Sequence, residues 1–427
     1  MSIEKLYQLF LQSSGVTTDT RNIKVGTIFF ALKGENFNAN TFAEEALKNG
    51  CAYAVVDEEK YAVDDRIILV DNSLKALQNL ANYHRKQFTI PVLGITGSNG
   101  KTTTKELIGA VLETTYNVLV TSGNFNNHIG VPLTLLNLNI DHEIAIIEMG
   151  ANKPGDIQEL CEIAEPTHGI ITNIGAAHIE GFGSIQGVIK TKTEMFRFIN
   201  SVRGILFLNW DDEVLKNNLP GNYEVVTYGL ESGDVQGSVE KLDPYLNFSW
   251  RAEDYKSEVI KSNLVGNYNI LNFLAAICIG RFFNVEAEKM NKSLSSYAPT
   301  NNRSQIEKTK RNTLIVDCYN ANATSMQAAL ENFVAMSGEN KLAILGGMRE
   351  LGDISIAEHQ KIADFLADKK IDVRLIGTEF DETKTQFIKY NAVADYMANE
   401  KVTDIANQLI LLKGSRGIKL ENLISSL

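Results

Sequence analysis

The sequence has few cysteines, no excess of positive charge and no long apolar run, and each lack excludes a class of protein. Its four cysteines lie far apart without a Cys-x-x-Cys pair, so neither a disulfide framework nor a zinc site is favoured. The net charge of −11 argues against non-specific binding of nucleic acid, which needs a basic surface. No stretch approaches the roughly 20 apolar residues that span a bilayer. We therefore expect a cytoplasmic protein that binds no nucleic acid and does not insert into membranes.

The length predicts several domains. At roughly 150 residues per domain, 427 residues suggest two to four, and the pattern changes divide the chain into three. Hydrophobic residues make up 44% and charged residues 22%, as in globular proteins. We expect an N-terminal domain over 1–88, a central domain over 89–298 and a C-terminal domain over 299–427.

Alternating strand and helix patterns predict the α/β fold class. The first domain mixes short strand-like and helical runs, whereas 235–265 has the polar-apolar alternation of an antiparallel appendage. A helix is expected near 269–283. The central domain should therefore hold a parallel, helix-covered sheet and the C-terminal domain a Rossmann-like one. Their expected strands are 92–96, 118–121, 144–149, 169–174, 313–317, 341–345, 373–376 and 409–412.

A glycine-rich segment between an expected strand and an expected helix predicts a phosphate-binding loop. Residues 94–103 read Gly-Ile-Thr-Gly-Ser-Asn-Gly-Lys-Thr-Thr. In such a setting, backbone N–H groups and the helix dipole bind phosphate, Lys101 reaches the β- and γ-phosphates, and the Thr102 hydroxyl reaches Mg²⁺. The common Walker pattern has a glycine where Ile95 stands, but Gly97 lies within the loop. A loop of this kind does not choose between kinase, ATPase and ligase.

Two further residues stand where open α/β sheets place ligands. Glu148 ends an expected strand, and His178 follows the next one. Together they suit a Mg²⁺ shell that faces the phosphate loop. The alternative for Glu148 is a strand-end carboxylate that caps the next helix, and His178, taken alone, is more often a satisfied structural histidine.

Several segments resemble the Mur ligase family in order and spacing. The phosphate loop is similar to that family's loop, and Tyr268 stands where the family usually has histidine. The other similar segments are Gly-Asn-Phe-Asn-Asn-His-Ile-Gly-Val-Pro at 123–132, Ile-Glu-Met-Gly-Ala-Asn at 147–152, Thr-Asn-Ile at 172–174, Ala-His-Ile-Glu at 177–180 and Gly-Asn-Tyr-Asn-Ile-Leu-Asn at 266–272. The resemblance implies an ATP-dependent ligase that activates a carboxylate as an acyl phosphate and couples it to an amine.

Motifs in the outer domains resemble one group within that family. They read Thr-Asp-Thr-Arg at 18–21, Phe-Ala-Leu-Lys-Gly at 30–34, Asp-Cys-Tyr-Asn-Ala-Asn at 317–322 and Gly-Gly-Met-Arg-Glu-Leu-Gly at 346–352. They are similar to the ligases that add D-alanyl-D-alanine to UDP-N-acetylmuramoyl-tripeptide in peptidoglycan synthesis. The Asp-Asn-Pro-Arg motif of the diaminopimelate-adding ligases is absent. The resemblance implies these two small-molecule substrates, and we expect a monomer.

The resemblance also implies the residues of the site. ATP would contact Gly97, Ser98, Asn99, Gly100, Lys101, Thr102, Thr103, Asn269, Asn272, Arg303 and Asp317, although the segment around Arg303 departs from the usual Gly-Arg-Leu. Within this set, Asn269 would contact the adenine edge and Asp317 the ribose hydroxyls. Mg²⁺ would lie near Thr102, Glu148, His178 and Lys192, and the catalytic residues would be Lys101, Glu148, His178 and Lys192. Thr20, Arg21, Lys33 and Gly34 would contact the uracil and pyrophosphate of the UDP sugar. Asn126, Asn127, Tyr319, Asn320 and Asn322 would contact the substrates elsewhere. Without the resemblance, a single arginine of this kind is more often a solvated surface residue, and Tyr319 with its neighbouring asparagines would form an ordinary turn.

Lys192 falls where Mur ligases resemble one another in carrying a lysine carbamylated by CO₂. An ammonium beside Mg²⁺ is repelled, whereas a carbamate presents two anionic oxygens to a hard cation. One alternative is an amphipathic helix over 184–199 whose Lys190 and Lys192 face water, and another is that Lys190 is the modified residue.

Two other functions remain open from the sequence. A different Mur-type ligase would act on another amino acid or on a folate. A nucleotide-gated binding protein or plain ATPase would hydrolyse ATP without an amine-dependent product.

Overall fold

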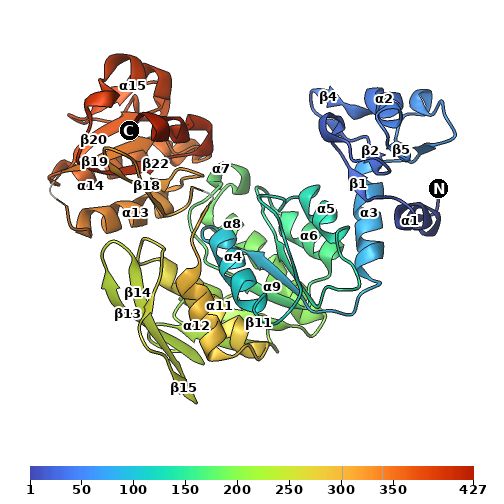
Figure 1. Ribbon diagram of the computed structural model, residues 1–427, viewed down its shortest axis with the longest axis horizontal. Coiled ribbons are helices and arrows are strands. Elements are labelled where there is room, and N and C mark those ends of the chain that lie inside the picture. Colours follow the sequence, from blue (N-terminus) through green and yellow to red (C-terminus); the bar gives the residue numbers. More distant parts are fainter. Residues whose placement is uncertain (301, 339) are drawn as a thin grey trace.

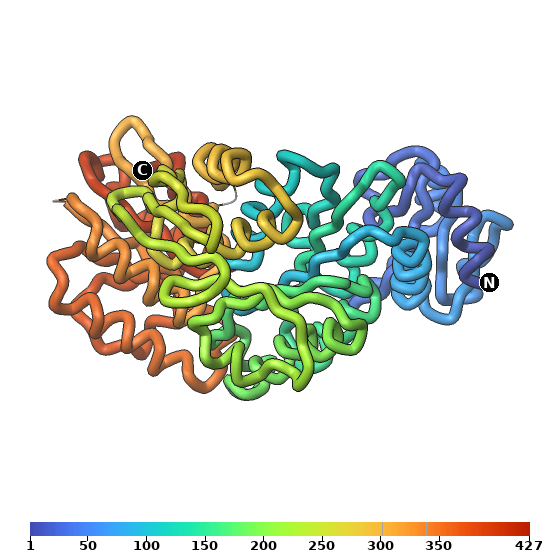
Figure 2. The backbone as a smooth tube through the Cα atoms, turned by 90° about the horizontal axis from the view of Figure 1, so that it is seen from below, coloured from blue at the N-terminus to red at the C-terminus, as the bar shows by residue number. Residues whose placement is uncertain are grey.

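The computed structural model describes residues 1–300, 302–338 and 340–427, and these form three α/β units with separate sheets. Figure 1 shows the central unit between the N-terminal unit (blue) and the C-terminal unit (orange to red). The turned view in Figure 2 shows the same row of three, so the molecule is elongated. The predicted fold class is confirmed. Among the described residues, every helix is too short or too polar to cross a bilayer.

The N-terminal unit is a small parallel sheet between helices. Its strands lie in the order β1-β2-β5-β6, and β3 and β4 form a separate hairpin. Alternate residues of the sheet face opposite sides, since Phe29 packs toward α2 whereas Ile28 belongs to the core with α1 and α3. The elements are α1 (Ile3–Leu11), β1 (Val16–Thr17), β2 (Ile28–Phe30), β3 (Lys33–Gly34), β4 (Phe37–Asn38), α2 (Ala43–Lys48), β5 (Tyr53–Val56), β6 (Ile67–Leu69) and α3 (Ser73–Arg85).

The central unit contains the largest sheet, ordered β15-β14-β13-β12-β11-β10-β7-β9-β8, with β16 beside β14. Strands β7 to β13 pair in parallel with their neighbours. Strand β14 pairs antiparallel with β13, as expected for the predicted antiparallel appendage. The strands are β7 (Val92–Thr96), β8 (Val118–Val120), β9 (Ile144–Glu148), β10 (His168–Ile171), β11 (Ile205–Asn209), β12 (Glu224–Gly229), β13 (Val235–Leu242), β14 (Leu246–Ala252), β15 (Tyr255–Lys256) and β16 (Ile260–Lys261).

Helices cover both faces of this sheet. Within β9, Ala145 and Ile147 belong to one core and Ile144 and Ile146 to the other, as expected for a parallel sheet buried on both sides. A second helix, α12, follows α11, so the expected 269–283 helix does not close the unit. The helices are α4 (Lys101–Leu112), α5 (Gly130–Leu135), α6 (Asp156–Ala164), α7 (Ile179–Phe182), α8 (Ile185–Lys192), α9 (Glu194–Ser201), α10 (Glu213–Lys216), α11 (Asn269–Phe282) and α12 (Ala287–Ser296).

The C-terminal unit is a six-stranded sheet in the order β17-β18-β22-β19-β20-β21. All pairs are parallel except β17 with β18, an edge strand that the sequence patterns did not predict. The elements are β17 (Gln305–Lys308), β18 (Thr313–Asp317), α13 (Ala323–Ala335), β19 (Lys341–Gly346), α14 (Ser355–Ala367), β20 (Asp372–Ile376), β21 (Ile388–Tyr390), α15 (Val393–Asn399) and β22 (Leu409–Lys413).

The order of the central strands places three loops at one edge. Strand β7 lies between β9 and β10, with Ile95 opposite Glu148 and Thr96 opposite Ile171. The loops that follow these three strands therefore emerge side by side at their carboxyl ends. Open α/β sheets bind ligands at such a point.

Candidate functional site

The loop between β7 and α4 has the backbone of a phosphate-binding loop. Gly97 has φ +148 and Gly100 has φ +78, which side chains other than hydrogen disfavour. A Cβ at Gly97 would lie 2.0 Å from Thr172 Oγ1, and one at Gly100 would lie 2.8 Å from Asn272 Oδ1. Both glycines are therefore required by conformation and by space, and α4 starts directly after them.

The loop is held by residues that follow β10. The Thr172 hydroxyl donates to Asn99 O at 2.6 Å, and Asn173 Oδ1 accepts from Asn99 N at 3.0 Å. Ser98 N donates to Asn173 O at 2.9 Å. These three hydrogen bonds hold the loop in place. In the sequence, Thr172 and Asn173 belong to a segment that resembles the Mur ligases. That resemblance does not indicate that they lie beside the phosphate loop.

Lys101 curls over the loop that precedes it. Its Nζ donates to Gly97 O at 2.6 Å and to Ser98 O at 3.1 Å. Desolvation lowers its pKa to about 8, an effect that the Glu148 carboxylate opposes and the Arg303 guanidinium reinforces. A phosphate that displaced the carbonyls would stabilise the ammonium again.

Glu148 is the buried carboxylate of the site, at the end of β9. Its Oε1 accepts from Thr102 Oγ1 at 3.2 Å and from Asn126 Nδ2 at 2.7 Å, and its Oε2 faces Lys105 Nζ at 3.4 Å. Lys105 was not predicted, although it lies one helical turn after Lys101 on α4. The spacing of four residues from Lys101 places both lysines on one side of the helix, and this was the signal in the sequence that could have indicated Lys105.

Lys192 is buried at the end of α8, with 2% of its surface exposed. Its Nζ lies 3.5 Å from Thr96 Oγ1 and 5.9 Å from the centre of the Phe182 ring. Desolvation, with a smaller repulsion from Lys101, holds its pKa well below the ordinary value. The alternative of a helix face whose Lys190 and Lys192 both meet water is wrong for Lys192, because Lys192 lies one turn after the buried Val188 and so shares the buried face of α8.

His178 faces the C-terminal unit. Its Nδ1 lies 2.6 Å from Glu350 Oε2, and the hydrogen bond to this histidine lowers the pKa of the Glu350 carboxyl. His178 and Glu148 both line the same cavity. In the described part of the chain, no three His, Cys, Asp or Glu side chains are grouped closely enough to hold a metal ion by themselves. A metal ligand role for His178 stays a prediction.

The predicted adenine and ribose residues line the cavity from two different units. On α11, Asn269 Oδ1 accepts from Asn272 Nδ2 at 2.8 Å, and Asn272 Oδ1 accepts from Thr104 Oγ1 at 3.0 Å. On the C-terminal unit, Asp317 Oδ2 pairs with Lys413 Nζ at 2.6 Å. The fold thus brings residues of two units around one space.

A stacked cluster lies beside Asp317. The Arg303 guanidinium carbon lies 3.8 Å from the centre of the Tyr319 ring, and that of Arg416 lies 5.3 Å from the same centre. Such contacts between a cation and an aromatic face orient a guanidinium. Arg303 Nε is buried without a hydrogen-bond partner. Tyr319 and Asn320 line the cavity next to it.

Asn322 joins the C-terminal unit to the phosphate loop. Its Oδ1 accepts from Ser325 N and caps α13, and its Nδ2 donates to Asn99 Oδ1 at 2.8 Å. Asn127 instead uses its Oδ1 to accept from Ile129 N at 3.1 Å and from Gly130 N at 2.8 Å, where α5 begins. Both asparagines line the cavity, but their hydrogen bonds are structural ones.

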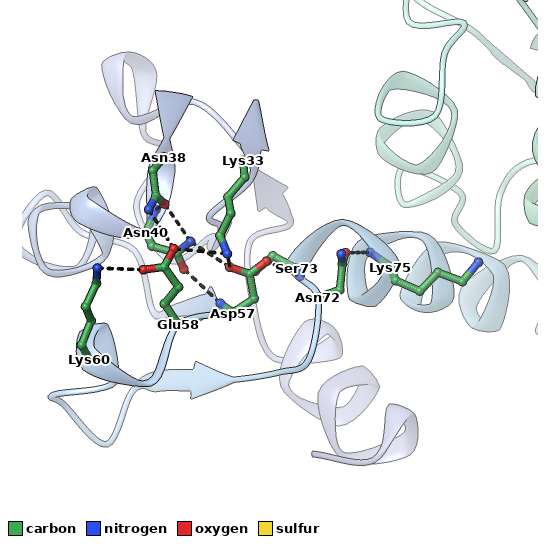
Figure 3. Close-up of polar contacts among 9 residues, drawn as sticks. All are labelled: Lys33, Asn38, Asn40, Asp57, Glu58, Lys60, Asn72, Ser73 and Lys75. Carbon is green, nitrogen blue, oxygen red and sulfur yellow. Dashed lines mark hydrogen bonds and ion pairs between the residues drawn. The ribbon is translucent and has the colours of Figure 1, made fainter. Parts of the chain in front are cut away.

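The four residues predicted to bind the UDP group lie outside this cavity. Arg21 is exposed and pairs with Asp19 at 2.6 Å. Lys33 pairs with Asp57 at 2.9 Å and with Glu58 at 3.2 Å, as Figure 3 shows, and these carboxylates raise its pKa. Thr20 and Gly34 lie on the same unit. A diphosphate would have to compete with two carboxylates for Lys33.

Most of the remaining predicted residues line one cavity of about 980 Å³, whereas Gly97 and Lys192 do not line it. It lies between the phosphate loop, the loop after β9 and the first turn of α13. Its volume matches that of ligand clefts. Of the predicted residues, those that line it are Ser98, Asn99, Gly100, Lys101, Thr102, Thr103, Asn126, Asn127, Glu148, His178, Asn269, Asn272, Arg303, Asp317, Tyr319, Asn320 and Asn322.

These features define a class: a phosphate-loop α/β protein with a ligand cavity closed by a second α/β unit. The Mur ligase middle domain matches residues 95–280, and the model described as "Mur ligase, glutamate ligase domain" matches 302–416. The UDP-N-acetylmuramoyl-tripeptide--D-alanyl-D-alanine ligase of Bacillus subtilis is 35% identical over 97% of this chain and 93% of its own length. The chain belongs to the Mur ligase family.

Solved structures agree over the whole length. MurF from Acinetobacter baumannii is 30% identical with a TM-score of 0.88, covering 100% of this chain and 98% of that one. MurF ligase from Thermotoga maritima in complex with ADP is 28% identical with a TM-score of 0.87, covering 97% of each chain. The similarity therefore includes the arrangement of all three units.

Proposed function

We propose that this chain is the ATP-dependent ligase that joins D-alanyl-D-alanine to UDP-N-acetylmuramoyl-tripeptide in peptidoglycan precursor synthesis. The observation that carries the proposal is the cavity that the phosphate loop and the C-terminal unit line together. The names of the full-length relatives support the substrates, and the ADP of the Thermotoga maritima structure supports the nucleotide.

The chemistry requires two successive displacements. The carboxylate of the tripeptide attacks the γ-phosphorus of ATP, and ADP leaves. The amine of D-alanyl-D-alanine then attacks the acyl carbon, phosphate leaves, and the amine loses a proton. Lys101 and the N–H groups of the phosphate loop neutralise the anions that meet in the first step, which is the main electrostatic task in phosphoryl transfer.

The surroundings of Glu148 suit Mg²⁺. Glu148 Oε2 is buried and accepts no hydrogen bond, and the Thr102 hydroxyl lies 3.2 Å from Oε1. Mg²⁺ prefers carboxylate, hydroxyl and phosphate oxygens. Glu148 and Thr102 would hold the ion with ATP, and the ion would add positive charge at the transferred phosphate. His178 would join them through its ring.

The buried Lys192 suits carbamylation. Its lowered pKa favours the neutral amine, and the neutral amine is the form that attacks CO₂. A C–N bond forms to the carbon of CO₂ while one of its C=O π bonds gives way to an anionic oxygen, the nitrogen loses a proton to solvent, and the neutral amine becomes a carbamate anion. That anion would add negative charge near Glu148 and complete a site for Mg²⁺.

The domain limits of 1–88, 89–298 and 299–427 remain part of this proposal, with the UDP sugar assigned to the first, ATP to the second and the amine to the third. We expect the working unit to be a monomer. The net charge of −11 supports a protein that binds no nucleic acid, and we place the reaction in the cytoplasm.

A panel of amines tests the proposed function. The purified chain is incubated with ATP, Mg²⁺ and UDP-N-acetylmuramoyl-tripeptide, and phosphate release is measured with D-alanyl-D-alanine, L-alanine, D-glutamate or diaminopimelate. We expect release to depend on D-alanyl-D-alanine. Dependence on another amine would assign a different Mur-type ligase, and release without any amine would indicate a plain ATPase.

Asp317→Ala is expected to raise the apparent KM for ATP by about ten- to hundredfold, because hydrogen bonds to a charged group are worth about 1.5–3 kcal/mol. A ribose contact is made in the ground and transition states alike, so kcat should change less. Steady-state kinetics measure both. Asp368→Ala, an exposed acid at the end of α14, is the control. Unchanged KM and kcat in Asp317→Ala would reject the contact.

Nucleotide affinity is expected to fall as the pH rises above about 8. The Lys101 pKa of about 8 belongs to the ligand-free protein, and a bound phosphate would raise it. Binding then takes up a proton above pH 8, which weakens affinity by up to about tenfold per pH unit. Titration calorimetry between pH 7 and pH 9.5 measures the trend, and Lys101→Arg should flatten it. A constant affinity in the unaltered chain would contradict the assignment.

A further inference from the structure

Lys105 is a buried cation that the proposed chemistry does not yet use. It lies on α4, one turn after Lys101, and 2% of its side chain is exposed. Its Nζ lies 3.4 Å from Glu148 Oε2, and only 1% of the Glu148 side chain is exposed. The same Nζ donates to Gly123 O at 3.3 Å.

The Glu148 carboxylate is held from two directions. Thr102 and Asn126 donate to Oε1, and both line the cavity. Lys105 faces Oε2 and is not among the residues that line the cavity. Lys105 is therefore placed to act on a ligand through Glu148 and not by touching the ligand.

The second contact of Lys105, its hydrogen bond to Gly123 O, also leads to Glu148. Gly123 begins the segment that leads to Asn126, and Asn126 Nδ2 donates to Glu148 at 2.7 Å. One ammonium thus fixes the carboxylate and the segment that carries a donor to it. A buried carboxylate without a paired cation is costly, because burial removes its hydration.

We propose that Lys105 is a positioning residue that sets the orientation of Glu148 and of segment 123–126 in the nucleotide site. This inference rests on the proposed ligase function, because the orientation of Glu148 affects the reaction only if a nucleotide and its cation bind there. A merely structural Lys105 would contribute to folding and leave the rate of the folded enzyme unchanged.

The kinetic test compares Lys105→Met with a matched buried cation outside the site. We expect Lys105→Met to lower kcat by about 10- to 100-fold, since small misplacements of catalytic groups have effects of this size. The KM for the UDP substrate should stay unchanged, and Lys105→Arg should recover part of the rate. Arg85→Met removes a buried cation of α3 that donates to Ala164 O and Phe88 O, and it should lower the thermal midpoint without changing kcat.

A second readout uses the ligand-free protein. The unfolding free energies of Lys105→Met, Glu148→Gln and the double variant form a double-mutant cycle. We expect the double variant to be less destabilised than the sum of the single ones, because each single change leaves the partner without its counterpart. Lys105→Gln replaces Lys105→Met if the methionine variant does not fold.

The outcomes separate this inference from the proposed function. An additive cycle, or a folded Lys105→Met with the kcat of the unaltered chain, would overturn the positioning role. Failure of the proposed function would instead appear as no ligation by the unaltered chain. The stability cycle is read without substrates and does not depend on that result.

Discussion

Lys101→Ala is expected to abolish measurable ligation while leaving the fold intact. Removing one neutral donor from a charge-stabilising site costs about 10²- to 10³-fold in kcat, and a lysine at the transferred phosphate should cost at least as much. Among the described residues, the side chain donates to Gly97 O and Ser98 O of its own loop and to no others, so its loss opens no core cavity. Product formation and the thermal midpoint are the two measurements.

The control for this change is a lysine that the cavity does not include. Lys48 lies in the last turn of α2 with 76% of its side chain exposed, and Lys48→Ala should leave the rate unchanged. If Lys101→Ala kept near-normal activity, the loop would not be the site of phosphoryl transfer.

Lys192→Ala is expected to lose most activity and to regain part of it when acetate or another small carboxylate is added. The substitution removes a side chain that is 2% exposed and so leaves a buried space beside Thr96. A small carboxylate in that space would restore the anionic oxygens that the carbamate provides. Rates with and without added acetate measure the rescue, and chloride at equal ionic strength controls for salt.

Lys190→Ala is the matched control, since Lys190 lies on the same helix and is exposed. It should keep full activity. The carbamate itself should appear as a carbon signal when the unaltered chain is incubated with ¹³C-labelled bicarbonate. Full activity in Lys192→Ala, or an unmodified ammonium beside bound Mg²⁺ and ATP, would refute the modification.

Much of the fold was predictable because strand and helix patterns are local. The expected strands 92–96 and 313–317 match β7 and β18, and segment 235–265 forms antiparallel strands. Strands β11 and β12 were missed, although they extend the central sheet. The position of β7 between β9 and β10 depends on how distant segments pair, and periodicity within one segment carries no information about that pairing.

The site was predictable where its residues share one loop and less so where it is assembled from distant segments. Residues 97–102 follow a spacing that backbone geometry requires, so their place at the end of β7 could be expected. The hydrogen bond between Asn322 and Asn99 joins residues 223 positions apart, and no local pattern indicates it. Lys33 was assigned to a diphosphate because lysine suits one, but Asp57 and Glu58 already balance its charge.

Mass spectrometry of the reaction products tests the proposed ligation most directly. The chain is incubated with ATP, Mg²⁺, D-alanyl-D-alanine and UDP-N-acetylmuramoyl-tripeptide whose reacting carboxylate carries ¹⁸O at both oxygens. We predict a UDP product whose mass is that of the labelled UDP-tripeptide plus that of the dipeptide, minus one ¹⁸O and two hydrogens. ADP should form with it, together with phosphate that carries one ¹⁸O, because the acyl phosphate transfers a carboxylate oxygen to phosphorus. Hydrolysis of ATP with an unchanged UDP-tripeptide and unlabelled phosphate would contradict it.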